Sequence, residues 1–74
     1  MKLEKWYTRN NRVIGLVYGH SKFCDGKSVV TSKVVYFNAT TREIITALGS
    51  IYYLGQCLYS SHEADYLDVL SNLN

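Results

Sequence analysis

Short runs of β-branched and aromatic residues dominate the chain as far as Tyr59. Each run has the length of a strand, and turn-forming residues separate it from the next. The runs predict strands at residues 5–8, 12–18, 28–37, 43–48 and 51–54. In the longest run, 28–37, the hydrophobic pattern changes phase at Ser32 and Lys33, which indicates a bulge or a bend.

Asparagine, aspartate and glycine mark the expected connections. The pairs Asn10-Asn11 and Asp25-Gly26 are typical turn sequences, and Gly49-Ser50 fits a two-residue hairpin turn with glycine first. Connections of this length are too short for parallel crossovers. We therefore expect the strands to pair in antiparallel fashion.

Helical spacing replaces the strand pattern after Tyr59. The apolar residues that recur at this spacing are Ala64, Tyr66, Leu67, Val69, Leu70 and Leu73. Ser60 and Glu63 form a capping-box sequence, and Asp65 and Asp68 fall on the side expected to face water. The pattern predicts one helix over residues 61–72. The expected fold is a single α+β domain, residues 1–74, with a C-terminal helix and a small antiparallel sheet or partly open barrel of four to five strands.

The length of the chain limits both its architecture and its stability. A chain of 74 residues excludes a multidomain enzyme and a repeat protein, and 47% hydrophobic residues exclude disorder. A domain of this size buries only roughly 60% of the surface of its unfolded chain, so a monomer would be marginally stable. Seven tyrosines suit an interface, because tyrosine buries area while keeping a polar tip. We expect a homo-oligomer, most simply a dimer.

The net charge of +2 hides an uneven distribution. Residues 1–42 contain all eight basic residues and two acidic ones and carry +6, whereas residues 43–74 contain four acidic residues and carry −4. Such a charge separation can steer a partner or favour head-to-tail contacts, or it can simply be a solvated surface. Eight bases are too few to require nucleic-acid binding.

The first residues and the hydropathy pattern bear on location. Lys2, Glu4 and Lys5 occupy the place where a signal peptide would need its apolar stretch, and no apolar run is long enough to span a membrane. We expect a soluble, cytoplasmic protein without a membrane partner. Its two cysteines are then expected to be reduced thiols.

Two cysteine–histidine pairs have spacings compatible with metal binding. His20 with Cys24, and Cys57 with His62, together would supply a tetrahedral zinc set. The alternatives are a disulfide, or a buried Cys57 with His20 and Cys24 in a loop, and this last alternative is favoured, so we expect no metal and no cofactor. Cys24 with His20 and Asp25 is a weak candidate for nucleophilic catalysis, because all three lie on one loop.

The chain is not expected to be an enzyme. It offers no paired carboxylates at a strand end, no convincing nucleophile with its base, and no cofactor-binding loop. Its aromatic residues, interleaved with bases in the first half, suit either a protein interface or a stacking surface for a nucleotide, and many would pack within the sheet.

Residues 19–27 form a long connection for so small a domain. Phe23 lies there among cationic neighbours and is either an anchor for a partner protein or a lid over the open end of the sheet. The acidic helix face is a second candidate surface. The candidate binding residues are His20, Lys22, Phe23, Lys27, Asp65 and Asp68.

Several short blocks share a pattern with a known class of proteins. The blocks are Gly19-His20, Phe23, Asp25-Gly26, Thr31-Ser32, Thr46, Gly49-Ser50 and Tyr53-Leu54-Gly55. Over about residues 12–55 the chain resembles small phage-encoded binding proteins. That resemblance implies inhibition of a host enzyme or defence system by protein contact in the host cytoplasm. The alternative is a nucleic-acid or signalling-nucleotide binding module that uses the basic, aromatic N-terminal half.

Overall fold

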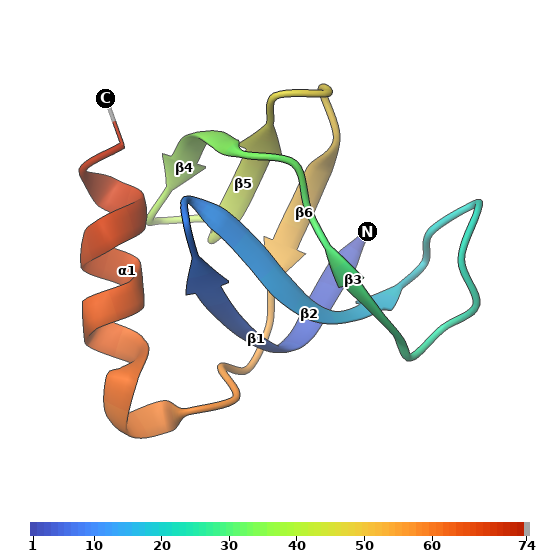
Figure 1. Cartoon of the computed structure of the whole chain (residues 1–74), viewed down its shortest axis with the longest axis horizontal. Coiled ribbons are helices and arrows are strands. Elements are labelled where there is room, and N and C mark those ends of the chain that lie inside the picture. Colours follow the sequence, from blue (N-terminus) through green and yellow to red (C-terminus); the bar gives the residue numbers. More distant parts are fainter. Residues whose placement is uncertain (74) are drawn as a thin grey trace.

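A computed structural model describes residues 1–73 and contains six strands, one 3₁₀ turn and one α-helix in that range (Figure 1). The elements are β1 (Lys2–Arg9), β2 (Arg12–Tyr18), β3 (Lys27–Val30), β4 (Val34–Asn38), β5 (Glu43–Thr46), β6 (Ile51–Leu54), η1 (Ser60–His62) and α1 (Glu63–Ser71). The predicted α+β class with a C-terminal helix is confirmed. The predicted number of strands, four to five, is too low.

The additional strand comes from the long hydrophobic run at residues 28–37. This run is divided between β3 and β4, and the division falls at the phase change that predicted a bend. The strand order is β3-β2-β1-β6-β5-β4, so the two halves of the run form opposite edges of one sheet. The bend therefore carries the chain from one edge of the sheet to the other.

The middle of the sheet is a parallel pair. Strands β1, β2 and β3 form one antiparallel meander, and β4, β5 and β6 form another. Strand β1 pairs with β6 in parallel, with Lys2 opposite Tyr53 and Leu3 opposite Leu54. The expectation of a purely antiparallel sheet was wrong at this position, because four intervening strands, rather than one short connection, return the chain to the side of β1.

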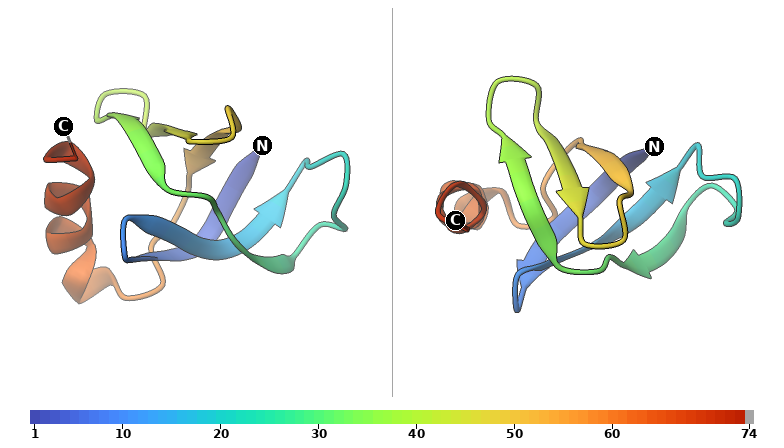
Figure 2. Two further views of the ribbon diagram at one scale, coloured as in Figure 1. Left: turned by 45° about the horizontal axis from the view of Figure 1, so that its top comes forward. Right: turned by 90° about the horizontal axis from the view of Figure 1, so that it is seen from above.

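The sheet curls around a small core that α1 covers on one side (Figure 2). Every strand except β3 contributes a buried residue to this core, and α1 contributes Leu70. Trp6 is fully buried, its ring lies 6.1 Å from that of Tyr66 on α1, and its indole N–H donates to the carbonyl of Gly55 at 2.9 Å. The core thus joins both meanders to the helix.

Arg42 connects the sheet to the start of the helical segment. Its Nε donates to the carbonyl of Leu54 and its Nη2 to that of Gly55, each at 3.1 Å, and Nη2 lies 3.3 Å from Glu63 Oε1. The predicted capping box does not form, because Ser60 begins η1 and Glu63 turns towards Arg42. In residues 1–73, no side chain makes a capping hydrogen bond at the start of α1.

The hairpin turns follow the sequence only in part. Asn10 and Asn11 form the predicted two-residue turn, with φ of 52° and 60°. The β5–β6 connection spans residues 47–50, which is longer than the expected two residues, and Gly49 adopts φ of 87° within it. This longer turn brings its residues towards the open end of the curled sheet.

Candidate ligand pocket

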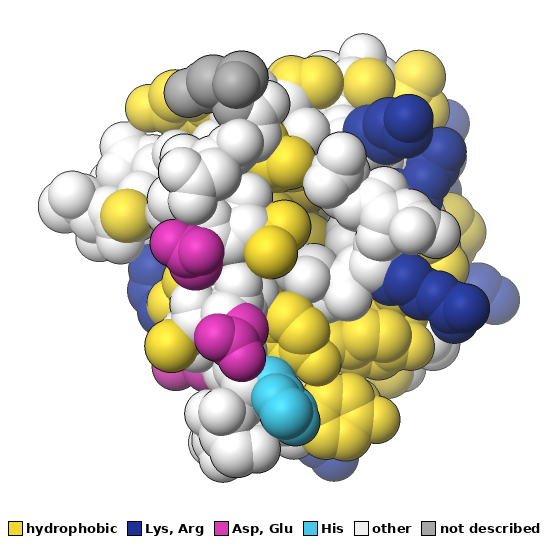
Figure 3. Space-filling view, turned by 60° about the vertical axis from the view of Figure 1, so that its left-hand side comes forward, with side chains coloured by type: hydrophobic (Ala, Val, Ile, Leu, Met, Phe, Trp, Pro, Cys, Tyr) yellow, Lys and Arg dark blue, Asp and Glu magenta, His cyan; other side chains and the backbone are white. Residues whose placement is uncertain are grey.

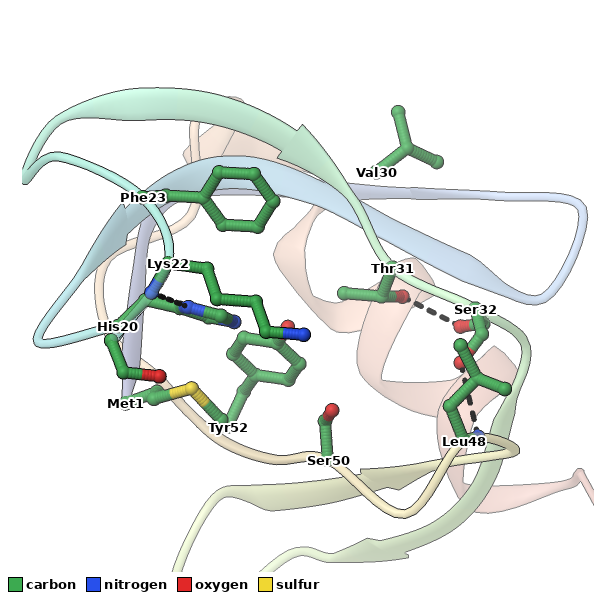
Figure 4. Close-up of a pocket in the computed structure, with 11 residues that line it drawn as sticks. Met1, His20, Lys22, Phe23, Val30, Thr31, Ser32, Leu48, Ser50 and Tyr52 are labelled. Atoms are coloured by element: carbon green, nitrogen blue, oxygen red, sulfur yellow. Dashed lines mark hydrogen bonds between the residues drawn. The ribbon is translucent and has the colours of Figure 1, made fainter.

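A cavity of about 420 Å³ lies at the open end of the curled sheet (Figure 4). Three connections surround it: the β2–β3 loop, the link between β3 and β4, and the β5–β6 turn. The ring of Tyr52, from β6, forms part of its lining. The cavity is therefore built from segments that are far apart in the sequence.

Two hydrogen bonds close the base of the β2–β3 loop. Asp25 Oδ1 accepts the N–H of Gly19 at 2.9 Å, and the N–H of Gly26 donates to the carbonyl of Val17 at 2.8 Å. Gly19 and Gly26 adopt φ of 75° and 87°, which other residues reach only with strain. The residues between these two glycines are consequently held in a defined bend over the open end of the sheet.

Three aromatic rings stand together at the cavity. The ring of His20 lies 4.7 Å from that of Phe23 and 6.4 Å from that of Tyr52, nearly parallel to the latter at 28°. His20 Nδ1 accepts the N–H of Lys22 at 2.9 Å, which assigns the proton of the neutral ring to Nε2. His20 therefore presents a hydrogen-bond donor rather than an acceptor at its free nitrogen.

The polar groups of the cavity favour an anion. Figure 4 shows the side chain of Lys22 extending into the cavity and the hydroxyl of Ser50 pointing towards it. Ser32 Oγ accepts the N–H of Leu48 at 3.4 Å and so joins two sides of the rim. Among the described residues that line the cavity there is one lysine and no carboxylate. This combination of ammonium, hydroxyl and imidazole N–H groups suits phosphate or carboxylate oxygens.

The structure brings together only part of the predicted set of site residues. His20, Lys22 and Phe23 all line the cavity, whereas Lys27 begins β3 outside the lining. Asp65 and Asp68 lie exposed on α1, at the opposite end of the molecule from the β2–β3 loop (Figure 1). Figure 3 shows acidic side chains gathered over that helix. The loop and the helix face are therefore two separate surfaces.

The ring of Phe23 stands at the edge of the cavity. Its ring packs against His20 beside the cavity, and it does not belong to the buried core. It remains 39% exposed, so a ligand could still contact it. Truncating Phe23 would consequently affect the cavity more than the stability of the fold.

Sequence reasoning missed Tyr52 and Ser50 as residues of this site. Tyr52 is a buried residue between two exposed neighbours in β6, a pattern that every inward-facing strand residue shows. The sequence predicts Ser50 as the second residue of a two-residue hairpin turn. No local signal distinguishes these two from structural residues, because their relation to the loop arises only from the pairing of distant strands.

The four residues of the alternative zinc set do not come together as a metal site in the described part of the chain. Cys24 is exposed on the β2–β3 loop, Cys57 is buried near α1, and within residues 1–73 neither forms a disulfide. In the same range, no group of three or more histidine, cysteine, aspartate or glutamate side chains is arranged to hold a metal ion. Burial raises the pKa of the Cys57 thiol above its ordinary value, so this thiol stays protonated at neutral pH.

Neither helical segment in residues 1–73 has the length and apolar character needed to cross a bilayer. Comparisons of the chain with protein-family models, with curated proteins and with solved structures found no match.

Proposed function

We propose that this chain is a non-catalytic binding protein whose cavity takes a small anionic ligand with a flat ring, of the nucleotide class. The observation that carries the proposal is the meeting of three aromatic rings, one lysine and three serines at a cavity of about 420 Å³. Small-molecule sites generally have volumes of about 300–1,000 Å³ and a few convergent polar groups among apolar ones.

The chemistry of the lining suggests how such a ligand would be held. A base would stack against the rings of Phe23 and Tyr52, which supply faces without sequence preference, at about 1–3 kcal/mol per base. A phosphate would accept hydrogen bonds from Lys22, from the Ser50 hydroxyl and from His20 Nε2. The ligand is thus expected to need both its ring and its charge.

Inhibition of a host protein remains a prediction with less support from the arrangement of side chains. That function needs Phe23 as an anchor that projects from the surface, whereas the ring of Phe23 packs against His20 at the cavity. Its second candidate surface, with Asp65 and Asp68, lies on the far end of the molecule. A nucleotide in the cavity would contact His20, Lys22 and Phe23 in the arrangement that they have in the structure.

The proposal is tested by nuclear magnetic resonance titration of the full chain with AMP, adenosine and inorganic phosphate in parallel. With AMP we expect saturable shifts of the amide signals of residues 20–23, Ser50 and Tyr52. Adenosine and phosphate should each bind more weakly, by about tenfold or more, because each makes only one of the two kinds of contact. Absence of saturable shifts at these residues up to millimolar AMP would refute the proposal.

Two lysines allow a matched control. Lys22→Ala removes the cation at the cavity, and Lys27→Ala removes an exposed cation outside its lining. We expect Lys22→Ala to weaken AMP binding by about tenfold, the effect of losing one charge-assisted hydrogen bond, and Lys27→Ala to change it by less than about twofold. Equal losses in both variants would show non-specific attraction to positive charge and would contradict the proposed site.

A further inference from the structure

A row of aromatic rings leads from β1 to the first turn of α1, away from the β2–β3 loop (Figure 1). The ring of Tyr59 lies 5.9 Å from that of Tyr7 and 6.3 Å from that of His62. The ring of His62 lies 6.2 Å from that of Tyr66, which packs against Trp6 of the core. We call Tyr7, Tyr59, His62 and Tyr66 the aromatic row. None of these four residues lines the cavity of the proposed function.

The local backbone places these rings on one side of the chain. The N–H of His62 donates to the carbonyl of Tyr59 at 2.8 Å, so these two residues lie one turn apart at η1. Residues three apart in a 3₁₀ turn project on the same side, as do residues four apart in an α-helix. The spacing 59, 62 and 66 therefore aligns three rings. The N–H of Leu58 donates to the carbonyl of Trp6 at 2.9 Å, which ties this segment to β1 beside Tyr7.

The middle of the aromatic row is open to solvent. Tyr59 is 50% exposed and His62 is exposed, whereas Tyr7 and Tyr66 are partly buried. The plane of the Tyr59 ring is inclined by 60° to that of Tyr7 and by 76° to that of His62. Inclined rings form corners, and a flat group seated in a corner touches two rings at once. Figure 3 shows hydrophobic side chains, the class that includes tyrosine, beside a histidine and acidic side chains on one face of the molecule.

The ionisable groups around Tyr66 are acidic. Partial burial raises the pKa of the Tyr66 hydroxyl, and neighbouring acidic groups raise it further; these groups are Cys57, Tyr59, Asp65 and Tyr7. Asp65 is the carboxylate among them, and it is exposed in the first turn of α1. A carboxylate beside aromatic ring faces favours a cation, because both attract positive charge.

The basic side chains of neighbouring elements leave the Asp65 carboxylate accessible. Arg42 pairs with Glu63, and Lys5 lines a separate small pocket on β1 and β2; within residues 1–73 neither base forms an ion pair with Asp65. Residues 43–74 contain no lysine or arginine. The first-turn carboxylates Glu63 and Asp65 also offset the partial positive charge of the helix N-terminus. Asp65 can therefore accept hydrogen bonds from a cation that another molecule supplies.

We propose that the aromatic row and Asp65 bind an arginine side chain of a basic partner protein. A planar guanidinium stacks on an aromatic face while its N–H groups donate to a carboxylate, and it is less strongly hydrated than an ammonium. A quaternary ammonium would contact the rings but has no N–H group for Asp65. The negative charge beside the rings is complementary to a basic partner. Binding at this surface does not depend on a ligand in the cavity.

Nuclear magnetic resonance titration of the full chain with three probes tests the chemistry. The probes are N-acetylated, C-amidated Gly-Arg-Gly, its counterpart Gly-Lys-Gly, and tetramethylammonium chloride. We expect the arginine peptide to produce saturable shifts at Tyr59, His62 and Asp65 in the millimolar range, and to bind about fivefold or more tightly than either other probe. Equal binding of the lysine peptide, tighter binding of tetramethylammonium, or the absence of saturable shifts at these residues would overturn the proposal.

Two pairs of variants test the position of the site. Tyr59 and Tyr36 are both 50% exposed, but Tyr36 lies on β4 outside the aromatic row. Asp65 and Asp68 are both exposed on α1, and of the two only Asp65 acts on Tyr66. We expect Tyr59→Ala and Asp65→Asn each to weaken binding of the arginine peptide by about fivefold or more, and Tyr36→Ala and Asp68→Asn to change it by less than about twofold. Circular dichroism verifies folding, and the exposed Asp65→Asn pair tests the site even where Tyr59→Ala alters the fold. Equal losses within either pair of folded variants would overturn the proposal.

Discussion

Thr31 is the residue through which the bend between β3 and β4 is held to β2. It is 4% exposed, and its N–H donates to the carbonyl of Val13 at 2.9 Å. Its hydroxyl accepts the N–H of Val13 at 3.0 Å and donates to the carbonyl of Ser32 at 2.7 Å. The hydroxyl thus takes the place that a backbone carbonyl would occupy in the strand ladder. Thr31→Val keeps the shape of the side chain and removes this hydroxyl.

The magnitude of the loss follows from the burial of this contact. In the variant, the N–H of Val13 loses its partner in a position closed to water, which costs about 1–3 kcal/mol. We therefore expect the free energy of unfolding to fall by about 2 kcal/mol. For a domain of this length, 1 kcal/mol corresponds to roughly 4–8 °C, so the melting temperature should fall by about 8–16 °C.

Thermal and urea unfolding, followed by circular dichroism at one low protein concentration, measure the effect without a contribution from association. Thr31→Ser is the control, because it keeps the hydroxyl and removes one methyl group, at a cost of about 1 kcal/mol. A loss below about 0.5 kcal/mol for Thr31→Val would refute the reasoning. Equal losses for the two variants would also refute it, since the methyl group and not the hydroxyl would then be responsible.

Two further predictions concern glycine packing and thiol access. Gly15→Ala should lower the free energy of unfolding in urea by about 1–3 kcal/mol, because the added Cβ would lie 3.1 Å from the Glu4 carbonyl oxygen and 3.2 Å from Trp6 Cβ. An unchanged free energy of unfolding would show that β1 shifts to make room for the added methyl group. Cys24 should react with Ellman's reagent in the native protein and Cys57 only on unfolding, because Cys57 is buried and its pKa is raised. Labelling of both thiols at the same rate in the native protein would contradict the burial of Cys57.

The elements that could be predicted from sequence are those determined by nearby residues. The β-branched run at residues 12–18 appears as β2 with unchanged bounds, and the phase change at Ser32-Lys33 marks the bend between β3 and β4. Asn10-Asn11 forms the expected turn, because asparagine tolerates positive φ. In each case the determining pattern spans only a few residues.

The features that sequence reasoning missed arise from contacts between distant segments. The capping-box sequence did not cap α1, because Glu63 pairs with Arg42, which lies 21 residues earlier in the sequence. The loop residues at the cavity could be singled out, but Tyr52 could not, since its place beneath them depends on the pairing of β1 with β6. Local patterns carry no information about such partners.

The pairing of β1 with β6 also sets the order in which the chain can fold. The first meander forms from neighbouring residues, but one edge of β1 stays open until β6 arrives, and the contact between Lys2 and Tyr53 closes a loop containing four other strands. Contacts of such high sequence separation slow folding, because the entropy of loop closure is lost before the contact is gained. During synthesis, a completed first half therefore exposes an unpaired strand edge, and the native sheet assembles only after the residues of β6 have left the ribosome.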